Sequence, residues 1–165
     1  MRNAAIIPQK IYDLNRLKHA VEVWRFLGKT ISFTNGVFDI LHQGHVYSLS
    51  QAAQEADMLI VGVNSDASVK RLNKGPERPI NDQNSRALLL ASMLMVDAVI
   101  VFDEDTPYEL ITTLMPDVLV KGGDYRVEEV VGHKEILANG GNVVINPIVE
   151  GFSTTGIVER MRHQK

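Results

Sequence analysis

Two histidines, His42 and His45, end the stretch "TNGVFDILHQGH" (34–45), just where a loop should turn into a helix. Residues three positions apart lie on one side of a helix. The first turn of a helix also has unpaired backbone N–H groups and a dipole that favour an anion. Gly36 and Gly44 leave room for a ligand to approach the backbone. The stretch therefore predicts a phosphate site with two imidazole donors above it.

Two other interpretations of the histidines stay open. One histidine could cap or pack while the other is solvated, as is common for a lone histidine. A zinc site would need further ligands, and His133 and His163 stand alone without convincing spacing. We expect no metal held by protein ligands.

A second candidate anion site is "GFSTTGIVERM" (151–161), where Ser153, Thr154 and Thr155 should open the last helix. Hydroxyls at a helix start are often only caps. In a parallel sheet wound on both faces, however, this helix start would reach the same sheet edge as the histidines. Two anion sites at one edge indicate a polyphosphate ligand.

Two loops add candidate ligand contacts. The segment 64–86 is interrupted by Gly75, Pro76 and Pro79, which indicates a loop that closes over a ligand, although a solvated basic face is a common alternative. In "VKGGDYR" (120–126), two glycines would let the backbone approach a flat ring and Asp124 could bond ribose or base; a simple tight turn is equally compatible. The cations of the first loop are Lys70, Arg71, Lys74, Arg78 and Arg86.

The elements that must position these residues follow from the apolar pattern. Helical spacing predicts an opening helix over 11–27 that ends at Gly28. Thr106, Pro107 and Glu109 predict a capping box at another helix start. Short apolar runs alternate with helices, which predicts a single α/β domain with a parallel sheet wound on both faces. The expected strands are 30–34, 58–63, 98–102, 118–121 and 143–145, and the other expected helices are 46–56, 81–96, 128–138 and one from Ser153.

Composition limits the class of protein. A chain of 165 residues with 45% apolar content is expected to form one compact domain, with 1–29 as a helical extension and 30–165 as the functional domain. The net charge of -3 gives no general attraction to nucleic acid or an anionic membrane. The chain has no cysteine, no signal-peptide pattern after Met1 and no apolar run that would cross a bilayer. We therefore expect a soluble cytoplasmic protein.

Five segments in register resemble the nucleotidyltransferases of the cytidylyltransferase-like superfamily with the HxGH signature, and most closely their heptose 1-phosphate adenylyltransferases. They are "TNGVFDILHQGH", "VNSDASVKRL", "NSRALLL", "VLVKGGDY" and "EGFSTTGI", and the resemblance covers nearly all of 30–161. It implies a Rossmann-like sheet of five parallel strands, Mg²⁺ carried with ATP, and a homodimer. The implied reaction transfers AMP from ATP to D-glycero-β-D-manno-heptose 1-phosphate, giving ADP-heptose and pyrophosphate for lipopolysaccharide core synthesis, here in a stand-alone version without a sugar kinase segment.

The resemblance also implies roles for residues. His42 and His45 match the signature histidines that bind the triphosphate and stabilise the transition state, Lys70 matches a mobile lysine that reaches the phosphates, and Thr154 belongs to the closing helix start. Relatives often have cysteine at Val37 and isoleucine at Phe152, which would affect only the shape of the sugar pocket. The implied nucleotide-binding residues are Asn35, Gly36, Phe38, Asp39, Gly44, Arg86, Gly123, Asp124, Ser153 and Thr155.

Three points stay open at this stage. Asp39 is either a helper for the metal or a loop aspartate. The same chemistry could use CTP with glycerol 3-phosphate or phosphoethanolamine. A catalytically silent module that only binds ATP would carry the same phosphate sites.

Overall fold

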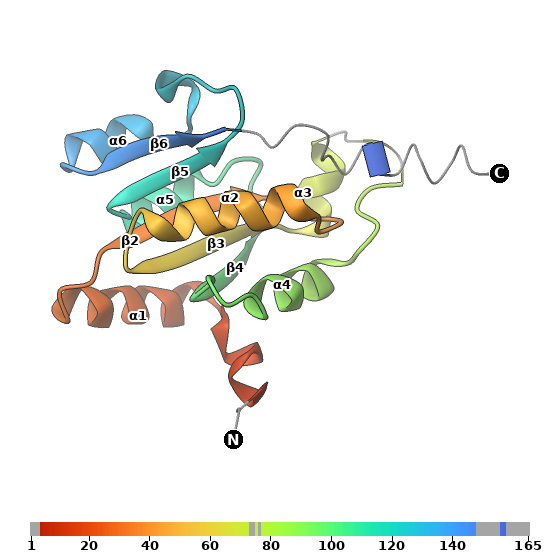
Figure 1. Ribbon diagram of the computed structural model, residues 1–165, viewed down its shortest axis with the longest axis horizontal. Coiled ribbons are helices and arrows are strands. Elements are labelled where there is room, and N and C mark those ends of the chain that lie inside the picture. The colour runs from red at the N-terminus through yellow and green to blue at the C-terminus, as the bar shows by residue number, and fades with distance from the viewer. Residues whose placement is uncertain (1–3, 73–74, 76, 148–155, 158–165) are drawn as a thin grey trace.

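A parallel sheet flanked by helices forms the centre of the computed structural model, which describes residues 4–72, 75, 77–147 and 156–157 (Figure 1). Within these residues the sheet has six strands in the order β1-β4-β3-β2-β5-β6. The strands are β1 (Ile11–Tyr12), β2 (Ile31–Gly36), β3 (Met58–Asn64), β4 (Ala98–Phe102), β5 (Val118–Gly122) and β6 (Asn142–Asn146). The helices are α1 (Leu14–Phe26), α2 (Gln43–Gln54), α3 (Asp66–Arg71), α4 (Gln83–Ala91), α5 (Tyr108–Leu114) and α6 (His133–Ala138). The predicted Rossmann-like, doubly wound fold is confirmed.

The sheet has one strand more than the five predicted. β1 pairs in parallel with β4, with Ile11 opposite Val99. The predicted helix start at Ile11 is therefore wrong, because α1 begins at Leu14 after the cap Asp13, whose side chain accepts the Arg16 N–H at 2.9 Å. A strand of two residues is too short to show a period of its own, so Ile11 fits the helical spacing of the residues that follow it.

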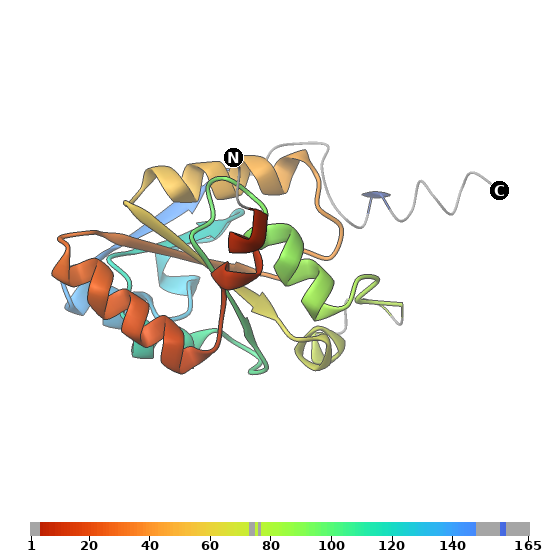
Figure 2. The same cartoon turned by 90° about the horizontal axis from the view of Figure 1, so that it is seen from below.

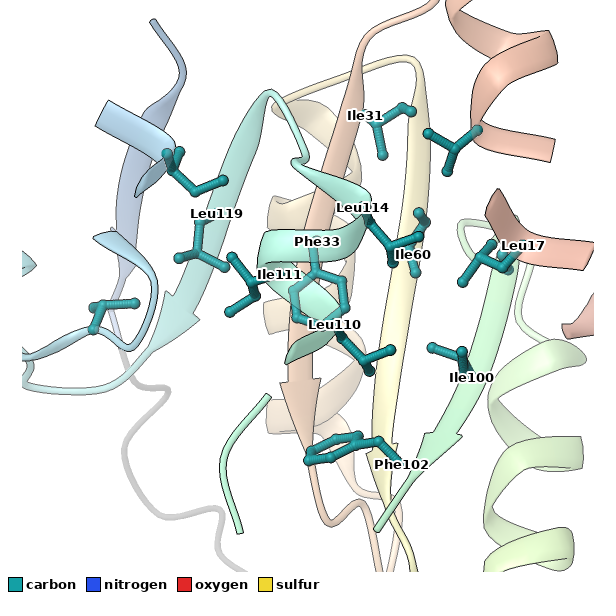
Figure 3. Packing of buried hydrophobic residues seen from close by; sticks show 14 of the residues in the cluster. Leu17, Ile31, Phe33, Ile60, Ile100, Phe102, Leu110, Ile111, Leu114 and Leu119 are labelled. Atoms are coloured by element: carbon teal, nitrogen blue, oxygen red, sulfur yellow. The ribbon is translucent and has the colours of Figure 1, made fainter. Parts of the chain in front are cut away.

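Helices cover both faces of the sheet (Figures 1 and 2). On one face, α1, α5 and α6 pack against a cluster that includes Phe33, Ile60 and Ile100 from the strands (Figure 3). On the other face, α2 and α4 pack on a second cluster that includes Leu49 and Leu90. Because both faces are covered, β3 and β4 are apolar at nearly every position.

The winding of the sheet reverses between β2 and β5. From β2 the chain passes to β3 and β4 through α2 and α4 on one face, and from β4 to β5 and β6 through α5 and α6 on the other. β2 and β5 are nevertheless paired, with Ser32 opposite Val118 and Phe33 opposite Leu119. Such a reversal leaves a crevice beyond the carboxyl ends of the two strands, where ligands of open α/β sheets bind.

Several element ends differ from those predicted. α2 begins three residues earlier than expected, at Gln43. The helix expected over 81–96 is α4 (Gln83–Ala91), and its cap is Asp82, which accepts the N–H groups of residues 84 and 85. The predicted capping box at Thr106 is wrong, because α5 starts after Pro107 without a side-chain cap. The predicted helix over 128–138 is divided into a 3-10 turn (Val127–Glu129) and α6, and the helix expected from Ser153 begins outside the described residues.

No helix in the described ranges is both long and apolar enough to cross a membrane.

Candidate active site

His42 and His45 stack on each other at the start of α2. Their ring centroids are 3.9 Å apart and their planes meet at 25°. His42 is the N-cap residue of this helix, with extended backbone, and His45 lies in the first turn. The ring of Phe38 meets His45 edge-on at 5.4 Å between centroids. Both imidazoles thus lie on the same side of a helix start, where backbone N–H groups favour an anion.

Both imidazoles are neutral at pH 7. The pKa of His45 is lowered to about 4, first by burial and then by repulsion from His42, while hydrogen bonding with the Ile40 backbone acts in the opposite direction. Burial also lowers the pKa of His42. A neutral imidazole has one N–H, and that of His45 is engaged by the Ile40 backbone; a phosphate beside the pair would favour protonation, which supplies a second N–H donor. The pair is therefore suited to receive negative charge without carrying a permanent positive charge.

Asp39 fixes the loop that leads into the histidines. Its side chain is buried, with 1% of the residue exposed. The carboxylate accepts the backbone N–H groups of Ile80 at 2.8 Å and Asn81 at 2.9 Å, and it forms an ion pair with the guanidinium of Arg78. The Asn81 amide in turn donates to the Asp39 carbonyl oxygen at 2.5 Å. The carboxylate oxygens are thus directed at the segment 78–81, which places Asp39 as a loop anchor.

Arg86 is engaged entirely with protein groups. It is fully buried at 0% exposure. Its guanidinium donates to the carbonyl oxygens of Val37 at 2.7 Å and Asn81 at 3.0 Å, and to the Asp66 carboxylate at 2.7 Å. Arg86 therefore joins α4 to the histidine loop and to α3. Its guanidinium thus contacts the segments around Val37, Asn81 and Asp66.

Lys70 stands on a helix that is fixed to its neighbours. The hydroxyl of Ser65 caps α3 by accepting the Ser68 N–H at 3.0 Å. At the other end, Arg71 pairs with Asp105 in the loop after β4 at 2.6 Å. Lys70 itself is exposed in the last turn of α3. The first part of the basic segment is therefore anchored helix at the carboxyl edge of the sheet.

Two glycines predicted as binding residues allow close packing. A Cβ on Gly36 would lie 3.0 Å from the ring of Phe38, which itself has a φ of 52°. Gly123 has a φ of +132°, and a Cβ there would lie 2.8 Å from the ring of Tyr125. Asp124 next to it is exposed. Gly44 lies in the first turn of α2, and the predicted Ser153, Thr154 and Thr155 lie outside the described residues.

A pocket of about 250 Å³ opens at the point where the winding reverses. Gly36 and Val37 line it, while the next residue, Phe38, contacts His45, so the pocket and the histidine pair flank one loop. Of its polar lining only Asn35 was among the predicted site residues. Lys121 could have been found, since it is a cation ending an apolar strand. The polar lining consists of Asn35, Asn64, Asp105, Thr106, Lys121, Tyr125 and Glu129.

The described side chains form no group of three or more His, Cys, Asp or Glu that could hold a metal ion. Asp39 lies closest in sequence to the histidines, and its carboxylate is already bonded to the segment 78–81. A Mg²⁺ ion that arrives with a nucleotide fits this arrangement, because it is held mainly by phosphate oxygens and water.

The helix start with two imidazoles lies beside a pocket of mixed lining at the reversal point of a Rossmann-like sheet, an arrangement typical of α/β domains that bind nucleotides. A family model described as "Cytidylyltransferase-like" matches residues 33–160. The chain therefore belongs to the cytidylyltransferase-like family of nucleotidyltransferases, the class of enzyme that the sequence predicts.

Curated relatives carry the name "Bifunctional protein HldE". The protein from Rhodospirillum rubrum is 53% identical over 152 residues, which are 92% of this chain and 30% of the relative. The protein from Rhodopseudomonas palustris is 56% identical over 147 residues, or 89% of this chain and 30% of the relative. The chain thus spans less than a third of the length of these relatives.

Two solved structures share the fold. A lipopolysaccharide core biosynthesis protein from Thermoplasma volcanium is 33% identical with a TM-score of 0.60, over 74% of this chain and 98% of that one. A pantoate-beta-alanine ligase from Francisella tularensis is 17% identical with a TM-score of 0.59, over 92% of this chain and 76% of that one. The second likeness concerns the fold alone.

Proposed function

We propose that this chain is an adenylyltransferase that transfers AMP from ATP to D-glycero-β-D-manno-heptose 1-phosphate, with ADP-heptose and pyrophosphate as products. One observation carries the proposal: two different polar sites flank the loop 36–38, namely the neutral histidine pair and the small pocket that contains Lys121. The transfer needs two such sites, one for a triphosphate and one for a small acceptor. The name of the Thermoplasma volcanium protein supports a role in lipopolysaccharide core synthesis.

The triphosphate of ATP would lie at the start of α2. First-turn N–H groups and the imidazoles of His42 and His45 donate to its oxygens, and Lys70, exposed on α3, can approach from the same sheet edge. Ser153, Thr154 and Thr155 belong to this proposal as a second set of donors. Bound Mg²⁺ would neutralise part of the phosphate charge. Gly123 and Asp124 remain the proposed contacts to ribose and base.

The acceptor would occupy the pocket. A volume of about 250 Å³ is at the small end for ligand sites, which suits a monosaccharide phosphate. Its rim supplies hydroxyl-binding groups, among them Asp105, Thr106 and Glu129, and its floor is apolar with Ile111 and Leu119. Such a mixture binds the two faces of a sugar ring.

In the proposed mechanism a phosphate oxygen of the acceptor attacks the α-phosphorus of ATP in line. A bond forms between this oxygen and the phosphorus, the bond to the β-phosphate oxygen breaks, and pyrophosphate leaves with the electron pair. A phosphate monoester is already anionic at neutral pH, so no protein nucleophile or general base is needed. The chain contributes positioning and hydrogen bonds to the charge that develops in the transition state.

A second candidate uses the same site with CTP and glycerol 3-phosphate or a similar small phosphate, and the description of the family favours keeping it.

A homodimer in the cytoplasm also belongs to the proposal, and light scattering during gel filtration tests the dimer.

The experiment is a substrate panel with product identification. The protein is incubated with Mg²⁺, each of ATP, CTP, GTP and UTP, and either anomer of heptose 1-phosphate or glycerol 3-phosphate. Pyrophosphate release is followed, and the product is identified by mass and ³¹P NMR. We expect ADP-heptose from ATP. A preference for CTP would overturn the heptose assignment, and nucleotide binding without pyrophosphate under any condition would identify a silent module.

A further inference from the structure

We infer that Lys121 is the cation that binds the phosphate of the acceptor, and that Asn35 positions it; the inference rests on the proposed function. Lys121 lies near the end of β5 and lines the pocket, whereas His42 and His45 are not among the lining residues. The motif "VKGGDYR" contains Lys121, but the roles predicted from it concern only its glycines and Asp124.

Lys121 is held in place from two sides. Its Nζ donates to the Oδ1 of Asn35 at 3.2 Å, across the β2–β5 pair where the winding reverses. The same Nζ lies 5.7 Å from the centroid of the Tyr125 ring. Asn35 and Tyr125 also line the pocket. The ammonium is thus positioned at the pocket wall before any ligand arrives, which reduces the entropy lost on binding.

The charges of the pocket make a cation necessary for an anionic acceptor. Among the described residues that line it, Lys121 is the one Lys or Arg, while Asp105 and Glu129 are acids. Asp105 is paired with Arg71 at 2.6 Å, and Glu129 accepts the backbone N–H of Arg126 at 2.8 Å. The carboxylates suit the hydroxyls of a sugar and repel its phosphate. The phosphate group is therefore directed to Lys121.

The end of β5 also contacts the helix that carries the histidines. A Cβ on Gly122 would lie 3.0 Å from the hydroxyl oxygen of Ser48, which is one turn beyond His45 in α2. The absence of a side chain at Gly122 lets the strand end and the helix pack closely. Side chains alternate along a strand, so Gly122 faces α2 while Lys121 faces the α5 side with Leu119 and Ile111. A phosphate on Lys121 would therefore meet the phosphates at the helix start beyond the strand end, as an in-line attack requires.

The test is calorimetric binding of two probes to the full chain. The probes are heptose 1-phosphate and the Mg²⁺ complex of α,β-methylene-ATP. Lys121→Met keeps most of the stem and removes the charge, Lys121→Arg restores the charge, and Lys134→Met on α6 is the matched control because Lys134 is exposed and does not line the pocket. Thermal unfolding of each variant verifies the fold.

For Lys121→Met we expect heptose 1-phosphate to bind at least about tenfold more weakly, with the ATP analogue within about twofold of wild type. Lys121→Arg should recover part of the loss, and the control should show none. Equal weakening of both probes, or unchanged sugar phosphate binding, would overturn the inference. Asn35→Asp is an independent variant: its carboxylate would pair with Lys121, so unchanged sugar phosphate affinity there would also contradict the assignment.

The outcome separates the two proposals. A wild type that forms ADP-heptose while Lys121→Met binds heptose 1-phosphate normally refutes the role of Lys121 alone. A wild type that binds the sugar phosphate through Lys121 and forms no ADP-heptose refutes the proposed function alone. A wild type that does not bind the sugar phosphate refutes both.

Discussion

His45 is partly buried and stacks on His42, and these two features determine its protonation state. Burial and the neighbouring His42 lower its pKa to about 4, so in the free protein it does not act as a fixed cation. A donor aimed at a transferring phosphoryl group stabilises charge that develops only in the transition state. The contribution of His45 should therefore be seen in turnover more than in nucleotide affinity.

We predict that His45→Ala lowers turnover at least about a hundredfold, since loss of one such donor costs about 3 kcal/mol. Pyrophosphate release gives the rate, and circular dichroism verifies the fold. His19→Ala on α1 is the matched control, because its side chain is 80% exposed. Full activity of His45→Ala would reject its assigned role.

The lowered pKa of His45 also predicts a pH dependence of stability. The unfolded chain has the ordinary value of 6.5, and the folded chain has a value of about 4. Below pH 6.5 the unfolded state binds a proton that the folded state does not, so the free energy of unfolding falls between pH 6.5 and about 4. Urea unfolding at pH 7 and pH 5 should show a smaller fall for His45→Gln than for wild type. Equal falls would contradict the burial of His45.

The spacing of the histidines is enough to predict that they lie together, because their geometry is local. The roles of Asp39 and Arg86 could not be predicted in the same way. Asp39 meets Ile80, which is 41 positions away, and Arg86 meets Val37, which is 49 positions away. Such contacts exist only once the sheet has formed, so the sequence shows the charges without their partners.

At the scale of elements, the strands β3 to β6 lie within one residue of the predicted strands, whereas the two-residue strand β1 and the ends of the helices differ from the predictions. β1 was missed because it has two residues. Thr106, Pro107 and Glu109 have the residue types of a capping box, yet α5 starts after Pro107 without a side-chain cap. Local signals are weaker than tertiary contacts at element ends.

We predict that the ion pair between Asp39 and Arg78 holds the segment 78–81 against the loop that leads into the histidines. Asp39→Ala removes the acceptor of two backbone N–H groups and of the Arg78 guanidinium, whose side chain is only 12% exposed. This loss should lower the unfolding free energy by about 3–5 kcal/mol. The double variant with Arg78→Met should cost less than the sum of the single variants, by about 0.5–3 kcal/mol.

Urea unfolding of the four proteins in this cycle gives the coupling. The exposed Asp124→Ala, which should change stability by less than about 0.5 kcal/mol, is the control. Strict additivity of the two changes would show that the ion pair does not hold the two segments together.

At the scale of the whole molecule, residues 11–26 are part of the packed core. Leu17 is fully buried at 0% exposure and Val21 at 3%, in one cluster with Phe33 and Ile60. Leu17→Ala should lower the unfolding free energy by about 2–5 kcal/mol. Phe26→Ala on the same helix should have a small effect, because Phe26 is 90% exposed. Equal effects of the two changes would mean that α1 does not pack as described.

The central claim is that one site transfers AMP directly from ATP to a sugar phosphate, without a covalent intermediate on the protein. The most direct test is the exchange of labelled pyrophosphate into ATP in the presence of Mg²⁺. Direct transfer predicts that label enters ATP when ADP-heptose is supplied and does not enter when every sugar nucleotide and sugar phosphate is left out. Exchange with ATP and pyrophosphate alone, or no exchange even with ADP-heptose, would contradict the account.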